Sequence, residues 1–177
     1  MATRLNNQIS DKLLSAAEKL VTERGAEGMS LGDVAACCDI SKGTLYYYFK
    51  TRDELLAALA ERCSSALEER LFAWMDGLTA VTSAEDAAKS LAAVFFSEGS
   101  PLPIFRELIS CFSDEAKSIC SAAAEAWRIV LEIASLRLGL AGESLAARSA
   151  LVVPLAVGLS ASGEEDPEKA LVTLLAG

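Results

Sequence analysis

The chain has 177 residues, of which 52% are hydrophobic and 23% charged, and 25 acidic against 16 basic side chains give a formal net charge of −9. With only 11 glycines and 4 prolines, this composition is typical of a helical globular protein and excludes a disordered or collagen-like chain. The sequence has no histidine, which excludes histidine-based general bases, metal ligands and nucleophile pairs.

The N-terminus lacks the basic and then apolar pattern of a secretory signal. The longest uncharged stretch, residues 149–163, is 15 residues long, and a bilayer requires about 20. Five cysteines form neither a CxxC pair nor an even disulfide framework, which favours reduced thiols. We therefore expect a cytoplasmic protein with no membrane segment.

Two helices are predicted at the start of the chain. Residues 9–24 place apolar side chains at helical spacing, and Gly25 supplies the stop. Ser30, with Asp33 three residues later, has the pattern of a capping box, so a second, short helix is expected to begin near Leu31.

A third helix is predicted at residues 42–49, capped by Ser41 after a turn of about four residues. Leu45 and Phe49 lie on one face of it and are expected to be buried. The residues of this helix expected to point outward are Thr44, Tyr47 and Tyr48.

A long amphipathic helix is predicted from a cap at Thr51 to about residue 76. The helices expected after it cover residues 84–98, 104–112, 113–139 and 143–160, with a proline-containing break at 100–103 and a short last helix from 167. No strand alternation is sustained anywhere. The predicted fold class is therefore all-α.

Two short helices joined by a tight turn, behind a supporting helix, form a helix-turn-helix, whose second helix enters the major groove of DNA. Three consecutive tyrosines on that second helix are too many for a core to bury. Residues 41–52 contain three cations and no acid, whereas residues 63–177 hold most of the negative charge. The local charge therefore suits DNA even though the whole chain is acidic.

From residue 11 to 60, and especially over SKGTLYYYFKTRDELL, the chain resembles the DNA-binding domain of the tetracycline-repressor (TetR) family. The resemblance covers about the first third of the chain. It implies a DNA-binding domain at 1–52, a helical ligand-binding and dimerisation domain at 53–177, and a homodimeric repressor that a small molecule releases from a pseudo-palindromic operator in double-stranded DNA. Such a protein is associated with the nucleoid when it is bound to DNA.

The resemblance also implies contacts to DNA. Positions expected to contact bases are Lys42, Gly43, Thr44, Tyr46 and Tyr48. Positions expected to contact phosphates are Ser30, Tyr47, Lys50 and Arg52. Two residues depart from the family pattern: Asp39 stands where relatives usually have glycine in the turn, and Tyr48 replaces a frequent histidine. Asp tolerates the left-handed conformation better than most residues, so the turn is expected to survive.

Beyond the DNA-binding domain, the resemblance implies a dimer interface and an effector pocket. The residues expected at the dimer face are Ala147, Leu151, Leu155, Gly158, Leu171 and Leu174. The residues expected to line a mainly apolar pocket are Phe72, Met75, Phe95, Phe105, Ile109, Phe112 and Trp127. For both sets an internal core is the alternative explanation. No cofactor or metal is expected, and the effector is not identified beyond a largely apolar character.

Two other classes of function remain as alternatives. An enzyme is disfavoured because histidine is absent and no GxGxxG, P-loop or GxSxG motif is present. A helical protein-interaction module would use the tyrosine-bearing helix to bind protein instead of DNA. The salt dependence of binding separates this module from a DNA-binding protein, because phosphate contacts make the affinity for DNA fall steeply with salt.

Overall fold

The computed structural model describes the backbone of residues 2–79, 81–138, 143–162, 166, 169–171 and 173, and the side chains of these residues except 2–6 and 143–148. In this part of the chain the secondary structure consists of eight helices and no strand, which confirms the all-α prediction. None of the described helices has the length and apolar character needed to cross a membrane.

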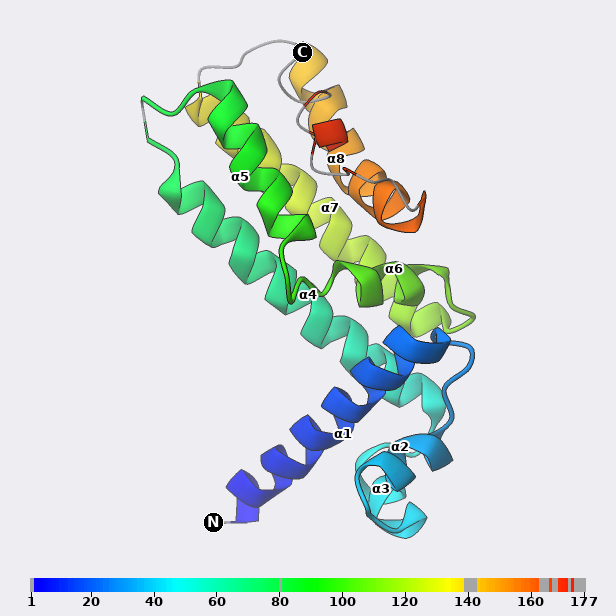
Figure 1. The fold of residues 1–177 in the computed structure, drawn as a ribbon. Coiled ribbons are helices and arrows are strands. Elements are labelled where there is room, and N and C mark those ends of the chain that lie inside the picture. The colour runs from blue at the N-terminus through cyan, green and yellow to red at the C-terminus, as the bar shows by residue number, and fades with distance from the viewer. Residues whose placement is uncertain are drawn as a thin grey trace. The chain divides into compact units, whose positions relative to one another are not determined.

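The helices follow one another along the chain as shown in Figure 1. Their bounds are α1 (Ala2–Arg24), α2 (Leu31–Cys37), α3 (Lys42–Tyr48), α4 (Arg52–Gly77), α5 (Ala84–Phe96), α6 (Leu102–Ser110), α7 (Asp114–Arg137) and α8 (Glu143–Ser162). Each corresponds to a helix predicted from the sequence. Two starts differ clearly from the prediction: α1 begins at Ala2, seven residues before the predicted residue 9. Helix α6 begins inside the predicted break because Pro103 lies in its first turn, where a helix needs no backbone N–H donor.

The predicted last helix is described only in part. Residues 169–171 are helical, and most of the segment from 167 onward lies outside the described residues.

The chain forms two compact units. The first comprises Met1–Arg62 and Glu107–Cys120, and the second comprises Cys63–Arg106 and Ser121–Gly177. The end of α6 and the start of α7 thus belong to the same unit as α1, α2 and α3. The functional division predicted between residues 52 and 53 stays a prediction.

Apolar faces of α1 to α4 form the core of the first unit, in which Leu13, Leu45 and Leu55 are fully buried. Helix α1 ends at Arg24, and the next residue, Gly25, adopts a φ of 75° that side chains disfavour, which agrees with the predicted stop. In the second unit, Phe105 and Trp127 are fully buried with ring centroids 4.9 Å apart.

Candidate nucleic-acid interface

Helix α2 begins with the predicted capping box. The Ser30 hydroxyl oxygen accepts a hydrogen bond from the Asp33 amide at 3.2 Å, and the Ser30 amide donates to the Asp33 carboxylate at 3.2 Å. The Ser30 hydroxyl also donates to this carboxylate at 2.5 Å. These bonds from Ser30, helped by the nearby charges of Arg24 and Lys42, hold the pKa of Asp33 below its ordinary value. Ser30 therefore fixes the start of α2.

The turn between α2 and α3 is closed by Asp39 in the left-handed conformation, with a φ of 53°. The Asp39 amide donates to the Ala36 carbonyl at 3.2 Å, and the Ile40 amide donates to the Ala35 carbonyl at 3.1 Å. This pair of bonds is a Schellman motif, which commonly ends in glycine. The expectation that Asp39 would tolerate this conformation is confirmed.

Helix α3 is capped by Ser41, whose hydroxyl oxygen accepts from the Thr44 amide at 3.0 Å. Leu45 and Phe49 are buried, as predicted. The two buried side chains fix the rotation of α3 about its axis, because they are four residues apart on one face. Helix α2 packs against α1 and α3, so the three helices form one frame.

The rest of α3 faces solvent. Lys42, Gly43, Thr44 and Tyr46 are exposed, and Tyr47 is the most exposed of the tyrosines at 76%. Tyr48 is half-buried, and its ring meets that of Tyr47 edge to face with centroids 5.3 Å apart. Four of the five residues predicted to contact bases are therefore exposed on one short helix, whereas the fifth, Tyr48, which the sequence predicts to point outward, is half-buried.

The fold of α3 does not require glycine at position 43. A Cβ placed on it would come no closer than 3.7 Å to its nearest neighbour, the Ser41 hydroxyl oxygen, which is an ordinary contact. The space in front of α3 at this position is open. A missing side chain here allows close approach to another molecule.

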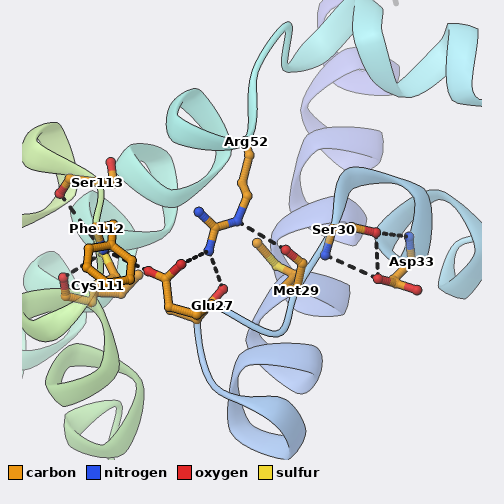
Figure 2. Close-up of polar contacts among 10 residues, drawn as sticks. Glu27, Met29, Ser30, Asp33, Arg52, Cys111, Phe112 and Ser113 are labelled. Atoms are coloured by element: carbon orange, nitrogen blue, oxygen red, sulfur yellow. Dashed lines mark hydrogen bonds and ion pairs between the residues drawn. The ribbon is translucent and has the colours of Figure 1, made fainter.

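The two cations that follow α3 differ in their surroundings. Lys50 is exposed, and its backbone amide donates to the Glu54 carboxylate at 2.6 Å. Arg52 has a side chain that is only 28% exposed, and its guanidinium turns toward the loop that follows α1 (Figure 2). Lys50 suits a phosphate contact in this structure, whereas Arg52 is engaged within the protein.

Arg52 donates three hydrogen bonds to this loop. Its Nε donates to the Met29 carbonyl at 3.1 Å, and its Nη2 donates to the Ala26 carbonyl at 2.6 Å and to the Glu27 carboxylate at 3.2 Å. The other carboxylate oxygen of Glu27 accepts from the Phe112 amide at 2.7 Å (Figure 2). Sequence reasoning did not single out Glu27, because its partner lies 85 residues away and no local pattern marks the pair.

The residues predicted to line an effector pocket fall into three groups. Phe95, Phe105 and Trp127 are buried, and Met75 and Ile109 are half-buried. Phe72 is exposed and Phe112 is 82% exposed, so neither lines an enclosed cavity in this structure. Phe112 lies in the turn between α6 and α7, where its backbone amide donates to the Glu27 carboxylate (Figure 2). Its ring is exposed.

The residues predicted at the dimer face are only partly described. On α8, Leu151 is 53% exposed, Gly158 is exposed and Leu155 is half-buried. Leu171 is fully buried within the single chain, which favours the internal-core alternative for this residue. The Ala147 side chain and Leu174 lie outside the described residues.

A three-helix frame with a capped helix pair and an exposed, acid-free second helix defines a helix-turn-helix protein. Residues 13–59 match the model of the family described as bacterial regulatory proteins, tetR family. This match confirms that the N-terminal part of the chain resembles the DNA-binding domain of this family. It is 33% identical over 61 residues to the HTH-type transcriptional repressor NemR of Escherichia coli, an alignment that covers 34% of this chain and 31% of that protein.

Solved structures extend the likeness to nearly the whole chain, as a likeness of fold. The reduced form of E. coli NemR superposes with a TM-score of 0.76 at 20% identity and covers 94% of both chains. AibR in complex with isovaleryl coenzyme A and operator DNA superposes with a TM-score of 0.72 at 17% identity, covering 94% of this chain and 97% of that one. The sequence alignment with the curated relative thus spans about a third of that protein's length. Beyond the N-terminal part of the chain, the likeness is one of fold alone.

Proposed function

We propose that the protein is a transcriptional repressor that binds a pseudo-palindromic operator as a homodimer and is released by a small molecule. The observation that carries this proposal is the exposed face of α3, which presents Lys42, Gly43, Thr44 and Tyr46 on a frame whose caps and buried residues fix its orientation. The mechanism is mechanical, and no chemistry is catalysed.

Within this proposal, the N-terminal turn of α3 enters the major groove. Lys42 donates to base acceptors, Gly43 permits close approach, and Thr44, Tyr46 and Tyr48 contact base edges. The exposed Tyr47 hydroxyl and the Lys50 ammonium contact phosphates. Ser30 lies at the start of α2, where the positive end of the helix dipole adds to its attraction for a phosphate.

The homodimer places two such helices on successive turns of one face of DNA, so the half-sites are centred about 34 Å apart. We assign the dimer interface to α8 and the segment after it, with Leu151, Leu155 and Gly158 as the described residues that support it. Sedimentation of the intact protein tests this assignment, and a monomer at micromolar concentration contradicts it.

The effector pocket is proposed in the second unit, where Phe95 is buried and the buried rings of Phe105 and Trp127 contact each other. AibR was solved with isovaleryl coenzyme A, which makes acyl compounds one class to test. A thermal-shift screen of fatty acyl compounds against lipophilic cations distinguishes the two classes. No shift with either class contradicts the pocket.

Selection of DNA sequences bound by the full chain tests the function as a whole. We expect a pseudo-palindromic site and an affinity that falls steeply with salt. Lys42→Ala is expected to change the selected sequence, whereas Tyr47→Phe and Lys50→Ala weaken binding to all sequences. A chain that selects no sequence and shows no salt-dependent binding supports the protein-interaction alternative.

A further inference from the structure

Arg52 fixes the loop that leads into α2. Its guanidinium holds the carbonyls of Ala26 and Met29, and Met29 directly precedes Ser30, the cap of α2. Since Arg52 is also the first residue of α4, the start of α4 and the start of α2 are held together by one side chain. A planar guanidinium presents its donors in a rigid fork, which suits it to this task.

Glu27 joins this arrangement to a distant part of the chain. One of its carboxylate oxygens accepts from Arg52 and the other accepts from the Phe112 amide (Figure 2). Phe112 lies between α6 and α7, and Ser113, the next residue, has a hydroxyl oxygen that accepts from the Ala116 amide in the first turn of α7. The carboxylate is thus the bridge between the α6–α7 turn and the loop that orients α2.

We propose that Glu27 is a positioning residue for DNA binding: it couples the α6–α7 turn to the placement of α2 and α3 through Arg52. The inference rests on the proposed function and adds to it the contact by which the C-terminal half of the chain governs the reading helix. It also reassigns Arg52, whose donors serve the 26–29 loop, from phosphate contact to positioning residue.

Electrostatics alone gives the opposite expectation for Glu27. Removing a negative charge from a DNA-binding unit strengthens its attraction for phosphates. In our proposal, by contrast, loss of the Glu27 bridge loosens α2 and α3 and so weakens DNA binding. Glu27→Gln removes the charge and leaves a single oxygen acceptor, so the direction of its effect separates the two explanations.

Coupling of this kind is reciprocal. If the bridge favours the DNA-binding arrangement, DNA must favour the bridge to the same extent. The Phe112 amide is then better protected from hydrogen exchange in the DNA complex than in the free protein. If Glu27 had a merely structural role, DNA would not increase the hydrogen-exchange protection of the Phe112 amide.

The experiment uses the full chain and the DNA fragment that the wild-type protein selects from a random pool. Glu27→Gln is compared with a control variant, Glu23→Gln, which changes an exposed acid on α1 that pairs with Lys19 at 3.9 Å. We expect Glu23→Gln to bind as tightly as wild type or slightly more tightly, and Glu27→Gln to bind about three- to tenfold more weakly, as the loss of one or two hydrogen bonds implies. In Glu27→Gln the DNA-induced protection of the Phe112 amide disappears.

Arg52 is tested by the salt dependence of binding. If it positions the loop, Arg52→Lys and Arg52→Ala weaken binding alike and leave the salt slope unchanged. A phosphate contact instead predicts that Arg52→Lys retains affinity and that Arg52→Ala lowers the slope by about one.

Equal binding by Glu27→Gln and Glu23→Gln, with wild-type binding intact, overturns the role of Glu27 and leaves the proposed function standing. Absence of DNA binding by the wild-type chain overturns the proposed function and this role together. In that case a protected Phe112 amide still reports that the bridge itself exists.

Discussion

Lys12 and Cys38 are joined by two hydrogen bonds that fasten α1 to the end of α2. The Lys12 ammonium donates to the Cys38 carbonyl at 2.8 Å, and the Cys38 thiol donates to the Lys12 carbonyl at 3.5 Å. The ammonium thus lies at the negative end of the helix dipole of α2. Cys38 directly precedes Asp39, so these two bonds hold the turn that places α3.

Lys12→Met keeps the aliphatic stem and removes the charge. We expect it to lower the free energy of unfolding by about 1 kcal/mol, the net value of one partly exposed hydrogen bond to a charged donor. Urea unfolding measures the change, with Lys19→Met, on the exposed face of α1, as the control. Equal midpoints for the two variants contradict the prediction.

Asp39 combines a left-handed backbone with a negative charge beside the proposed DNA face. Asp39→Asn keeps the backbone preference and removes the charge, so it should leave stability unchanged and raise operator affinity about two- to fivefold. Asp39→Ala removes the charge as well but should cost about 1 kcal/mol of stability, because alanine disfavours a positive φ. Fluorescence anisotropy with labelled DNA gives the affinities. A weaker complex for Asp39→Asn shows that the carboxylate assists binding.

Gly43→Ala tests whether the glycine serves the fold or the ligand. The nearest atom to the new Cβ is 3.7 Å away, so the variant should fold and gain up to about 1 kcal/mol from helix propensity. Its affinity for DNA should fall at least about tenfold, the effect of one misfitted contact to a base pair. Circular dichroism melting and DNA binding measured on the same sample check both expectations. Unchanged affinity removes Gly43 from the interface.

The capping box of α2 depends on pH through Asp33. Hydrogen bonds from Ser30 to the ionised carboxylate hold the pKa of Asp33 below its ordinary value of 3.8. Because the folded pKa is the lower one, the stabilisation is complete above pH 3.8 and is lost as the pH falls through the folded value. Carboxyl chemical shifts measured by NMR against pH report this pKa. Ser30→Ala should return it toward 3.8, and an Asp33 that titrates above 3.8 in the wild type contradicts the bonds.

Ser64 on α4 has a buried hydroxyl without a hydrogen-bond partner among the described residues. Ser64→Ala removes this uncompensated polar group, and we expect the free energy of unfolding to rise by about 1 kcal/mol. Ser113→Ala is the matched control, because its buried hydroxyl caps the Ala116 amide at 3.4 Å and its loss should destabilise. A destabilised Ser64→Ala variant shows that the hydroxyl is bonded in solution.

Local chemistry made most of the DNA-binding frame predictable. Ser30 with Asp33, Ser41 and Gly25 mark helix ends by residue type and spacing, and Leu45 with Phe49 identifies the buried face of α3. These signals act over three to five residues and can therefore be read along the chain. The start of α6 was harder, because a proline both breaks a helix and fits its first turn.

The surroundings of Arg52 and Phe112 could not be predicted in the same way. Lys50 and Arg52 lie in one basic segment, and composition alone predicts that both contact phosphates. Which of the two turns inward depends on carbonyls more than 20 residues earlier in the chain. Phe112 is aromatic and so fits a pocket by composition, but its place in a turn exposes the ring.

The borders of the two compact units have a practical consequence. They fall after Arg62, Arg106 and Cys120, which lie within α4, α6 and α7 rather than in loops. A gene fragment that stops at any of these borders would leave a cut helix with unpaired backbone groups. The unit that contains the proposed DNA-reading helix is therefore unsuited to expression as residues 1–62 alone, since it is completed by the later segment Glu107–Cys120.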